Sequence, residues 1–288
     1  MERFFILGCQ RTGTTLLRLI LEAHPDVACY DEIKGYAILQ NSVVENLAPA
    51  RLTGFKLPRW TEQLTRPILF DEGAEGFCTN FYRGEKILFL HRDVRDTVAS
   101  MLKLKAGASN WCELWVPRII NSKLAREADF RERYHKELSI IERGHSRLLG
   151  LAALYWKYKS DAYHAYCAIG LPVLAVHYED LVSEPRPVLQ AVCRHLDITF
   201  HSDLLRHHEL SHTELFSNGL AVGNSDPKKP IYADSVGQWV NFLSGQDVDL
   251  IYRIVGNVPA RQSTLSPSPL NTGSTSEISC AFPAGRAS

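Results

Sequence analysis

Residues 4–21 (FFILGCQRTGTTLLRLIL) combine a short apolar strand, a loop bracketed by glycines and an amphipathic helix. Gly8 and Gly13 have the spacing of a phosphate-binding loop, GxxxxGK[ST], and Thr15 fills the hydroxyl position. In such a loop the backbone N–H groups and the positive end of the helix hold an anion. We therefore expect an oxyanion site after the first strand. Its expected lining residues are Arg11, Thr12, Gly13, Thr14 and Thr15.

One position departs from that pattern. Thr14 stands where a nucleotide triphosphatase has the lysine that reaches the β- and γ-phosphates of its nucleotide. The nearest cation is Arg11, which lies inside the loop. The loop is therefore expected to bind an oxyanion without supporting magnesium-dependent ATP chemistry.

A second candidate anion site lies in residues 86–100, which combine an apolar strand, a cationic turn and a helix. Arg92 follows the strand end, where ligands bind in open parallel sheets. Ser100 lies about two helical turns later, so Arg92 and Ser100 can share one phosphate. Pairing of Arg92 with Asp96 remains the alternative. A metal-dependent triphosphatase would have aspartate at this strand end, where the chain has His91-Arg92.

These segments resemble a known family. Arg11-Thr12-Gly13-Thr14-Thr15 after an apolar strand is similar to the 5′-phosphosulfate loop of sulfotransferases that use 3′-phosphoadenosine 5′-phosphosulfate (PAPS). Residues 24–32 (HPDVACYDE) resemble tyrosylprotein sulfotransferases and soluble bacterial sulfotransferases, and residues 92–100 resemble the 3′-phosphate segment of the family. The resemblance implies PAPS as co-substrate, with no metal.

The resemblance also assigns roles to single residues. It makes Glu32 the catalytic base, with Asp31 as its competitor, and makes Arg11 and Lys56 the cations that stabilise the departing group. An ordinary charge on an edge strand is the alternative for Lys56. The nucleotide-binding residues that it implies, beyond the loop, are Arg92, Ser100, Tyr178 and Ser225. His24 and His91 stay open as bases, because many sulfotransferases use histidine.

The strand and helix patterns predict an α/β fold. Residues 4–7, 52–57, 86–90 and 172–176 have strand character, and helical segments such as 15–23, 93–103 and 186–196 alternate with them. We expect a single domain over residues 1–258, with a central parallel sheet flanked by helices in a P-loop-like topology. Residues 112–169 are expected to form two or more helices. The Ser-, Thr- and Pro-rich residues 259–288 are expected to be a disordered tail.

Composition limits the classes of partner. The chain has 32 basic and 32 acidic residues, so no global field favours nucleic acid or an anionic membrane. Seven cysteines without a CxxC pair suggest neither zinc nor a disulfide framework. Residues 4–7 are too short for the core of a signal peptide, and no later stretch is long and apolar enough to span a membrane. A cytoplasmic protein is expected.

Residues 208–212 read HELSH, a literal HExxH zinc motif. A zinc peptidase needs a third ligand, yet no glutamate occurs between Glu214 and Glu277. A solvated helix or a loop lining the acceptor is the expected alternative.

The sequence thus predicts sulfuryl transfer from PAPS to a hydroxyl or amine, with a small molecule or natural product as acceptor. A small-molecule P-loop kinase is the principal alternative, and the zinc peptidase is a remote one.

Overall fold

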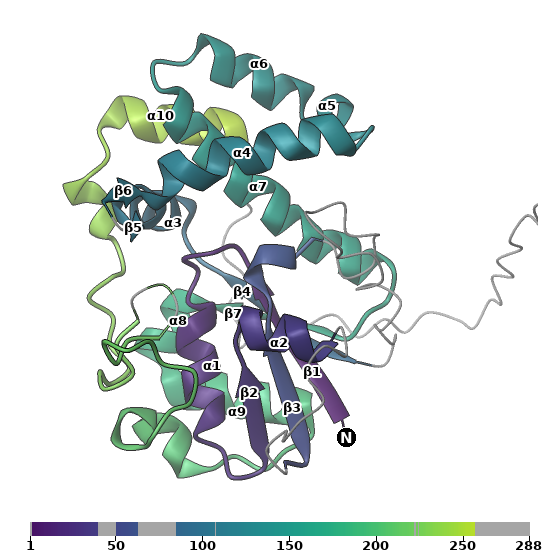
Figure 1. Ribbon diagram of the computed structural model, residues 1–288, viewed down its shortest axis with the longest axis vertical. Coiled ribbons are helices and arrows are strands. Elements are labelled where there is room, and N and C mark those ends of the chain that lie inside the picture. The colour runs from purple at the N-terminus through teal and green to yellow at the C-terminus, as the bar shows by residue number, and fades with distance from the viewer. Residues whose placement is uncertain are drawn as a thin grey trace, which may run out of the picture.

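The computed structural model of the protein describes residues 2–39, 50–62, 85–106, 108–221, 223 and 225–256. Figure 1 shows a lower layered part built on a sheet and an upper part built from helices, with the long helix α7 (Arg147–Ala168) reaching from one to the other. The segment 259–288, expected to be a disordered tail, lies outside the described residues.

The central sheet has five parallel strands in the order β2-β3-β1-β4-β7. The strands are β1 (Glu2–Gly8), β2 (Val27–Tyr30), β3 (Leu52–Lys56), β4 (Lys86–His91) and β7 (Val173–His177). The four strands expected from the sequence are present, and β2 is an additional edge strand. A second, two-stranded sheet consists of β5 (Lys105–Ala106) and β6 (Ser109–Asn110). The predicted α/β class with a parallel sheet is confirmed.

Helices cover both faces of the central sheet, as its continuous apolar strands require. Phe4 and Ile6 of β1 pack in one cluster with α1 (Thr14–Glu22), α8 (Tyr178–Ser183) and α9 (Pro185–Leu196). Phe5 and Leu7 point to the opposite face, toward α2 (Glu32–Leu39) and the carboxyl-terminal half of α7. This alternation follows from the two-residue period of a strand.

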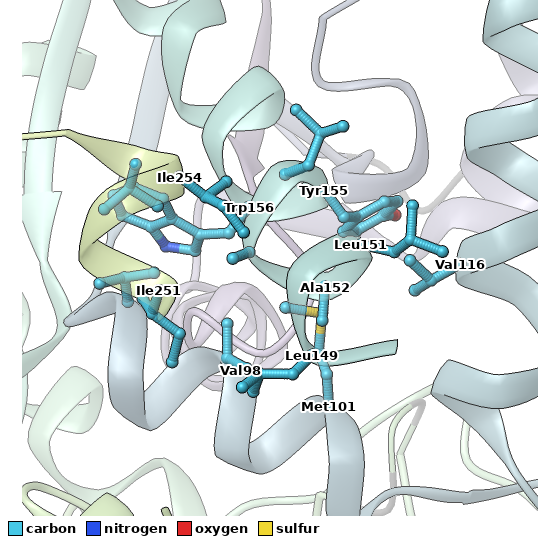
Figure 2. Close-up of a cluster of buried hydrophobic side chains, with 14 of the residues drawn as sticks. Val98, Met101, Val116, Leu149, Leu151, Ala152, Tyr155, Trp156, Ile251 and Ile254 are labelled. Atoms are coloured by element: carbon cyan, nitrogen blue, oxygen red, sulfur yellow. The ribbon is translucent and has the colours of Figure 1, made fainter. Parts of the chain in front are cut away.

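The upper part has its own core. It contains α3 (Val94–Lys103), α4 (Trp111–Arg126), α5 (Phe130–Arg133), α6 (His135–Arg143) and α10 (Gly245–Val255), which pack around the amino-terminal half of α7. Figure 2 shows Met101 of α3, Val116 of α4, Tyr155 of α7 and Ile254 of α10 in one apolar cluster. The helical expectation for residues 112–169 is therefore confirmed.

Three short 3₁₀ helices complete the described structure: Pro58–Trp60, Ser202–Glu209 and Gln238–Asn241. In the described part of the chain, no helix is long and apolar enough to cross a membrane.

Candidate functional site

All five parallel strands end at the same edge of the sheet, and a residue singled out by sequence lies at or just after each end. In open parallel sheets this edge is where ligands bind. The residues concerned are the glycine loop after β1, Glu32 after β2, Lys56 at the end of β3, Arg92 after β4 and Tyr178 after β7. The topology therefore gathers segments that are far apart in the sequence.

The glycine loop has the backbone of an anion cradle. Gly13 has a φ of 96° and is the N-cap of α1, where it offers no side chain to cover the first N–H groups of the helix. The start of the loop is fixed by Thr61, whose hydroxyl accepts from the Gly8 N–H at 3.0 Å and donates to the Gly8 carbonyl at 2.7 Å. The positive end of α1 is therefore open to an anion.

The Arg11 side chain leaves this loop and crosses to two other segments. Its Nε donates to the hydroxyl of Ser100 at 3.0 Å, and a terminal nitrogen donates to the Gly223 carbonyl at 2.7 Å. Burial, and then the charge of Arg92, lower the pKa of Arg11. Ser100 therefore contacts Arg11, whereas the sequence suggested that it shares a ligand with Arg92.

Arg92 approaches the same loop from β4. Its two terminal nitrogens donate to the carbonyl oxygens of Arg11 at 2.9 Å and Ser235 at 2.7 Å. Its Nε is buried and has no hydrogen-bond partner among the described residues. The alternative pairing with Asp96 does not occur, because the Asp96 carboxylate accepts from the backbone N–H groups of Gly237 and Trp239.

Tyr178 connects the two arginine segments. The Arg92 guanidinium lies 4.4 Å from the centre of its ring, within cation–π distance. The edge of the Tyr178 ring packs so closely on Gly13 that a Cβ at Gly13 would overlap it. The Tyr178 hydroxyl bonds to the hydroxyl of Ser235. Ser225 belongs to the turn whose Gly223 carbonyl binds Arg11, since Ser225 pairs with Ala221.

Lys56 reaches the glycine loop from β3. The side chain is 1% exposed, and its Nζ lies 3.4 Å from the Thr15 hydroxyl. β3 lies between β2 and β1, so the edge-strand alternative for Lys56 is wrong. Burial lowers the pKa of Lys56, and the carboxylates of Glu32 and Asp31 oppose that shift.

Glu32 begins α2 and is buried at 7% exposure. One of its oxygens accepts from the Arg59 N–H at 3.3 Å and lies 4.0 Å from the Arg59 Nε. Its neighbour Asp31 is also buried, but an Asp31 oxygen accepts from the Ile33 N–H at 3.0 Å and so caps the start of α2. The local geometry engages Asp31 in structure and leaves Glu32 as the stronger base candidate.

The two histidine alternatives have structural contacts. His24 Nδ1 accepts from the Asp26 N–H, and its Nε2 lies 2.7 Å from the Thr199 carbonyl oxygen. His91 stacks on His177, and burial together with the nearby His177 and His164 lowers the pKa of His91 to about 3. A histidine held neutral in this way is a poor partner for a hydroxyl proton at neutral pH.

The HExxH residues do not form a zinc helix. The 3₁₀ helix ends at Glu209, and Leu210 is extended (φ −104°, ψ 162°), so His208 and His212 are not one turn apart on a helix. His212 instead contacts a carboxylate oxygen of Glu22 at 3.0 Å. In the ranges that the structure describes, no group of three potential metal ligands is found.

Sequence reasoning missed several residues of this region. Ser235 and Gly223 lie in loops without periodicity, and they act partly through backbone carbonyls, which leave no trace in side-chain type. Arg18 did carry a signal, since it is the one charge within the apolar run of residues 16–21. It is buried, and it binds Thr213 and Glu214.

Known proteins with similar sequences are sulfotransferases. Residues 3–72 match a family model described as "Sulfotransferase family". The chain is 24% identical over 258 residues to a putative protein-tyrosine sulfotransferase of Caenorhabditis briggsae, which covers 84% of this chain and 82% of that protein. It is 23% identical to the protein-tyrosine sulfotransferase of Drosophila melanogaster, over 86% of this chain and about half (49%) of that protein.

Solved structures share the fold. A sulfotransferase domain from the curacin biosynthetic pathway superimposes with a TM-score of 0.54 at 16% identity, covering 90% of this chain and 99% of that domain. A sulfotransferase domain from the Synechococcus PCC 7002 olefin synthase also gives 0.54, at 18% identity, over 90% and 96% of the two chains. The matched amino-terminal segment, the curated relatives and this common fold all make the chain similar to sulfotransferases.

Proposed function

We propose that the protein transfers the sulfuryl group of PAPS to a hydroxyl or amine of an acceptor. One observation carries the proposal: Arg11 of the glycine loop and Arg92, which binds the Arg11 carbonyl, lie side by side, and neither has a carboxylate partner among the described residues. Two neighbouring half-buried cations are unfavourable unless an anion completes the site. A donor with phosphate groups at both ends of its ribose supplies that charge.

The two ends of the donor have separate binding groups in this proposal. The start of α1, which no side chain of Gly13 caps, and the loop residues Thr12, Gly13, Thr14 and Thr15 hold the 5′-phosphosulfate. Arg92 and Ser100 hold the 3′-phosphate, to which the Arg92 Nε can donate, because this atom has no partner among the residues that the structure describes. Tyr178 and the turn containing Ser225 contact the nucleotide beside them.

The proposed reaction is an in-line displacement at sulfur. Glu32 accepts the proton of the acceptor as the acceptor oxygen or nitrogen forms its bond to sulfur. The bond between sulfur and the bridging oxygen of the 5′-phosphate breaks, and the products are the sulfated acceptor and 3′-phosphoadenosine 5′-phosphate (PAP). Arg11 and Lys56 stabilise the negative charge on the departing oxygen, so the chain itself supplies the cations of the step.

We further propose a small molecule with an apolar body as the acceptor. Ile33, which follows Glu32 and exposes 67% of its surface, is the residue proposed to contact that apolar body. The curated relatives are named for protein tyrosine, and that acceptor is the competing outcome of the experiment.

The experiment measures PAP release from PAPS in the presence of EDTA. The acceptors are phenols, aliphatic alcohols, amines and tyrosine-containing peptides. The R11A variant is the inactive control, and R206A, which removes an exposed arginine, is the matched control. PAP release with small acceptors supports the proposal. PAP release with peptides alone would make protein tyrosine the acceptor. Consumption of ATP that depends on magnesium would support the kinase. Binding of PAP without any transfer would indicate a non-catalytic nucleotide-binding protein.

A further inference from the structure

Residues 212–214, a short segment after the 3₁₀ helix Ser202–Glu209, are held against α1 by the buried side chain of Arg18 and the half-buried side chain of Glu22. Arg18 is 1% exposed and donates to the Thr213 carbonyl oxygen at 2.9 Å. Glu22, one helical turn later, accepts from the Thr213 N–H at 3.0 Å and contacts His212 at 3.0 Å. The position of Glu214 is therefore set by the helix that follows the glycine loop.

The Glu214 carboxylate reaches from this segment to the start of α2. Its Oε2 accepts from the backbone N–H of Asp31 at 2.7 Å and from Arg18 at 3.2 Å. Arg18 in turn donates to the Cys29 carbonyl oxygen at the end of β2. Glu214 thus binds the residue immediately before Glu32, through a hydrogen bond to a charged acceptor, which is stronger than one between neutral groups.

The backbone of Glu214 is held in an uncommon conformation. Its φ is 56°, in the left-handed region, which is disfavoured for a residue other than glycine. Such a residue persists when its surroundings determine it, and these residues cluster at active sites and ligand clamps. Here the surroundings are the contacts of Arg18 and Glu22 with residues 212–214.

The charges around Glu214 connect it with the proposed reaction centre. Burial, and then the charge of Asp31, raise the pKa of Glu214, while Arg18 and Lys34 oppose that shift. Glu214 is also one of the carboxylates whose charge favours protonated Lys56. The remaining titratable neighbours on α1 and the loop are Glu22 and His212.

We propose that Glu214 is a positioning residue, which holds the first turn of α2 so that Glu32 faces the acceptor. The inference rests on the proposed function, because it concerns the base of that reaction. Without the bond from Glu214, the Asp31 N–H loses its acceptor and the start of α2 is free to move away from β3. A displacement of about 1 Å at a reacting group can lower the rate by about 100-fold.

The test compares E214A, E214Q and E209A. Glu209 is an exposed carboxylate nearby in the chain, so E209A controls for loss of charge. Amide hydrogen exchange of Asp31, in the absence of any substrate, reports whether the bond holds α2. In E214A we expect about 10-fold faster exchange, the value of one hydrogen bond to a charged group. We also expect kcat to fall by about 10–100-fold, with the KM for PAPS essentially unchanged.

Gln retains the oxygen that accepts from Asp31, so E214Q is expected to restore slow exchange and most of kcat. The inference is overturned if E214A has the same kcat and the same Asp31 exchange rate as E209A. It is also overturned if E214A shows fast exchange but a normal kcat. If E214A does not fold, E214Q is compared with the wild type alone. Slow exchange of the Asp31 amide together with an unchanged kcat in E214Q supports the inference. Fast exchange of that amide in E214Q overturns it. Wild-type protein that transfers no sulfuryl group refutes the proposed function and the catalytic role together, whereas the exchange rates still show whether Glu214 holds α2.

Discussion

The Arg92 guanidinium donates a hydrogen bond of 2.9 Å to the carbonyl oxygen of Arg11. The turn after β4 and the loop after β1 are therefore one unit, although about eighty residues separate them. Because the Arg11 side chain also binds Ser100, three segments of the proposed donor site depend on each other. A change at Arg92 is expected to affect both ends of the donor.

Arg92→Ala should raise the KM for PAPS far more than the KM for the acceptor. Charge-assisted hydrogen bonds contribute about 1.5–3 kcal/mol, so the expected increase is about 10- to 100-fold. Steady-state kinetics with each substrate varied in turn measures both constants. Unchanged donor affinity in R92A, with R206A as reference, would remove Arg92 from the donor site.

Glu32→Gln and Asp31→Asn separate the two candidate bases. Loss of a general base lowers the rate by about 10²- to 10⁴-fold, so E32Q should lose that much kcat while PAP still binds. D31N keeps an oxygen that can accept from the Ile33 N–H and should retain most of kcat. Calorimetric titration with PAP and kcat measurements decide the matter. A larger loss of kcat in D31N than in E32Q would make Asp31 the base.

The lowered pKa of Lys56 predicts how kcat/KM changes at alkaline pH. Burial lowers the pKa of Lys56 from its usual 10.5, so the ammonium loses its proton at a lower pH than an exposed lysine does. If the charge stabilises the departing group, kcat/KM falls as the pH rises through that lowered pKa, because kcat/KM reports groups of the free enzyme. The K56M variant should show a low rate without this alkaline decline. A wild-type profile that stays flat to the ordinary lysine pKa contradicts this role.

Gly13→Ala should destabilise the donor site because of two effects at one position. The φ of 96° disfavours any side chain, and the new Cβ would overlap the Tyr178 ring. Gly219 has a φ of 78° with open space around it, so Gly219→Ala carries the backbone strain alone. Thermal unfolding should show a larger fall in Tm for G13A than for G219A, and PAP should bind only to the latter. Equal behaviour of the two variants would mean that Tyr178 does not pack on the loop.

Local patterns predicted the parallel sheet and the strand, loop and helix around Gly8 and Gly13, because these elements are encoded in contiguous residues. The edge strand β2 was missed, since Val27–Tyr30 is only four residues long and has no alternation to mark it. Its presence matters, because it turns Lys56 from an edge position into an interior one.

Hydrogen bonds between side chains and groups far apart in the chain could not be predicted from the sequence. The spacing pairs Ser100 with Arg92, but in the structure the Arg11 side chain donates to Ser100 instead. The bond of Glu214 to the Asp31 N–H joins a side chain to a backbone group 183 residues away, and residue types alone do not encode such a pairing.

Binding of PAP and of AMP to the wild-type protein, in the presence of EDTA, tests the two-ended donor site most directly. The nucleotides differ only in the 3′-phosphate, which Arg92 is proposed to hold. We predict that PAP binds at least about 100-fold more tightly than AMP, as two or more charge-assisted bonds imply. Equal affinities, or tighter binding of ATP with Mg²⁺ than of PAP, would contradict the proposed donor site.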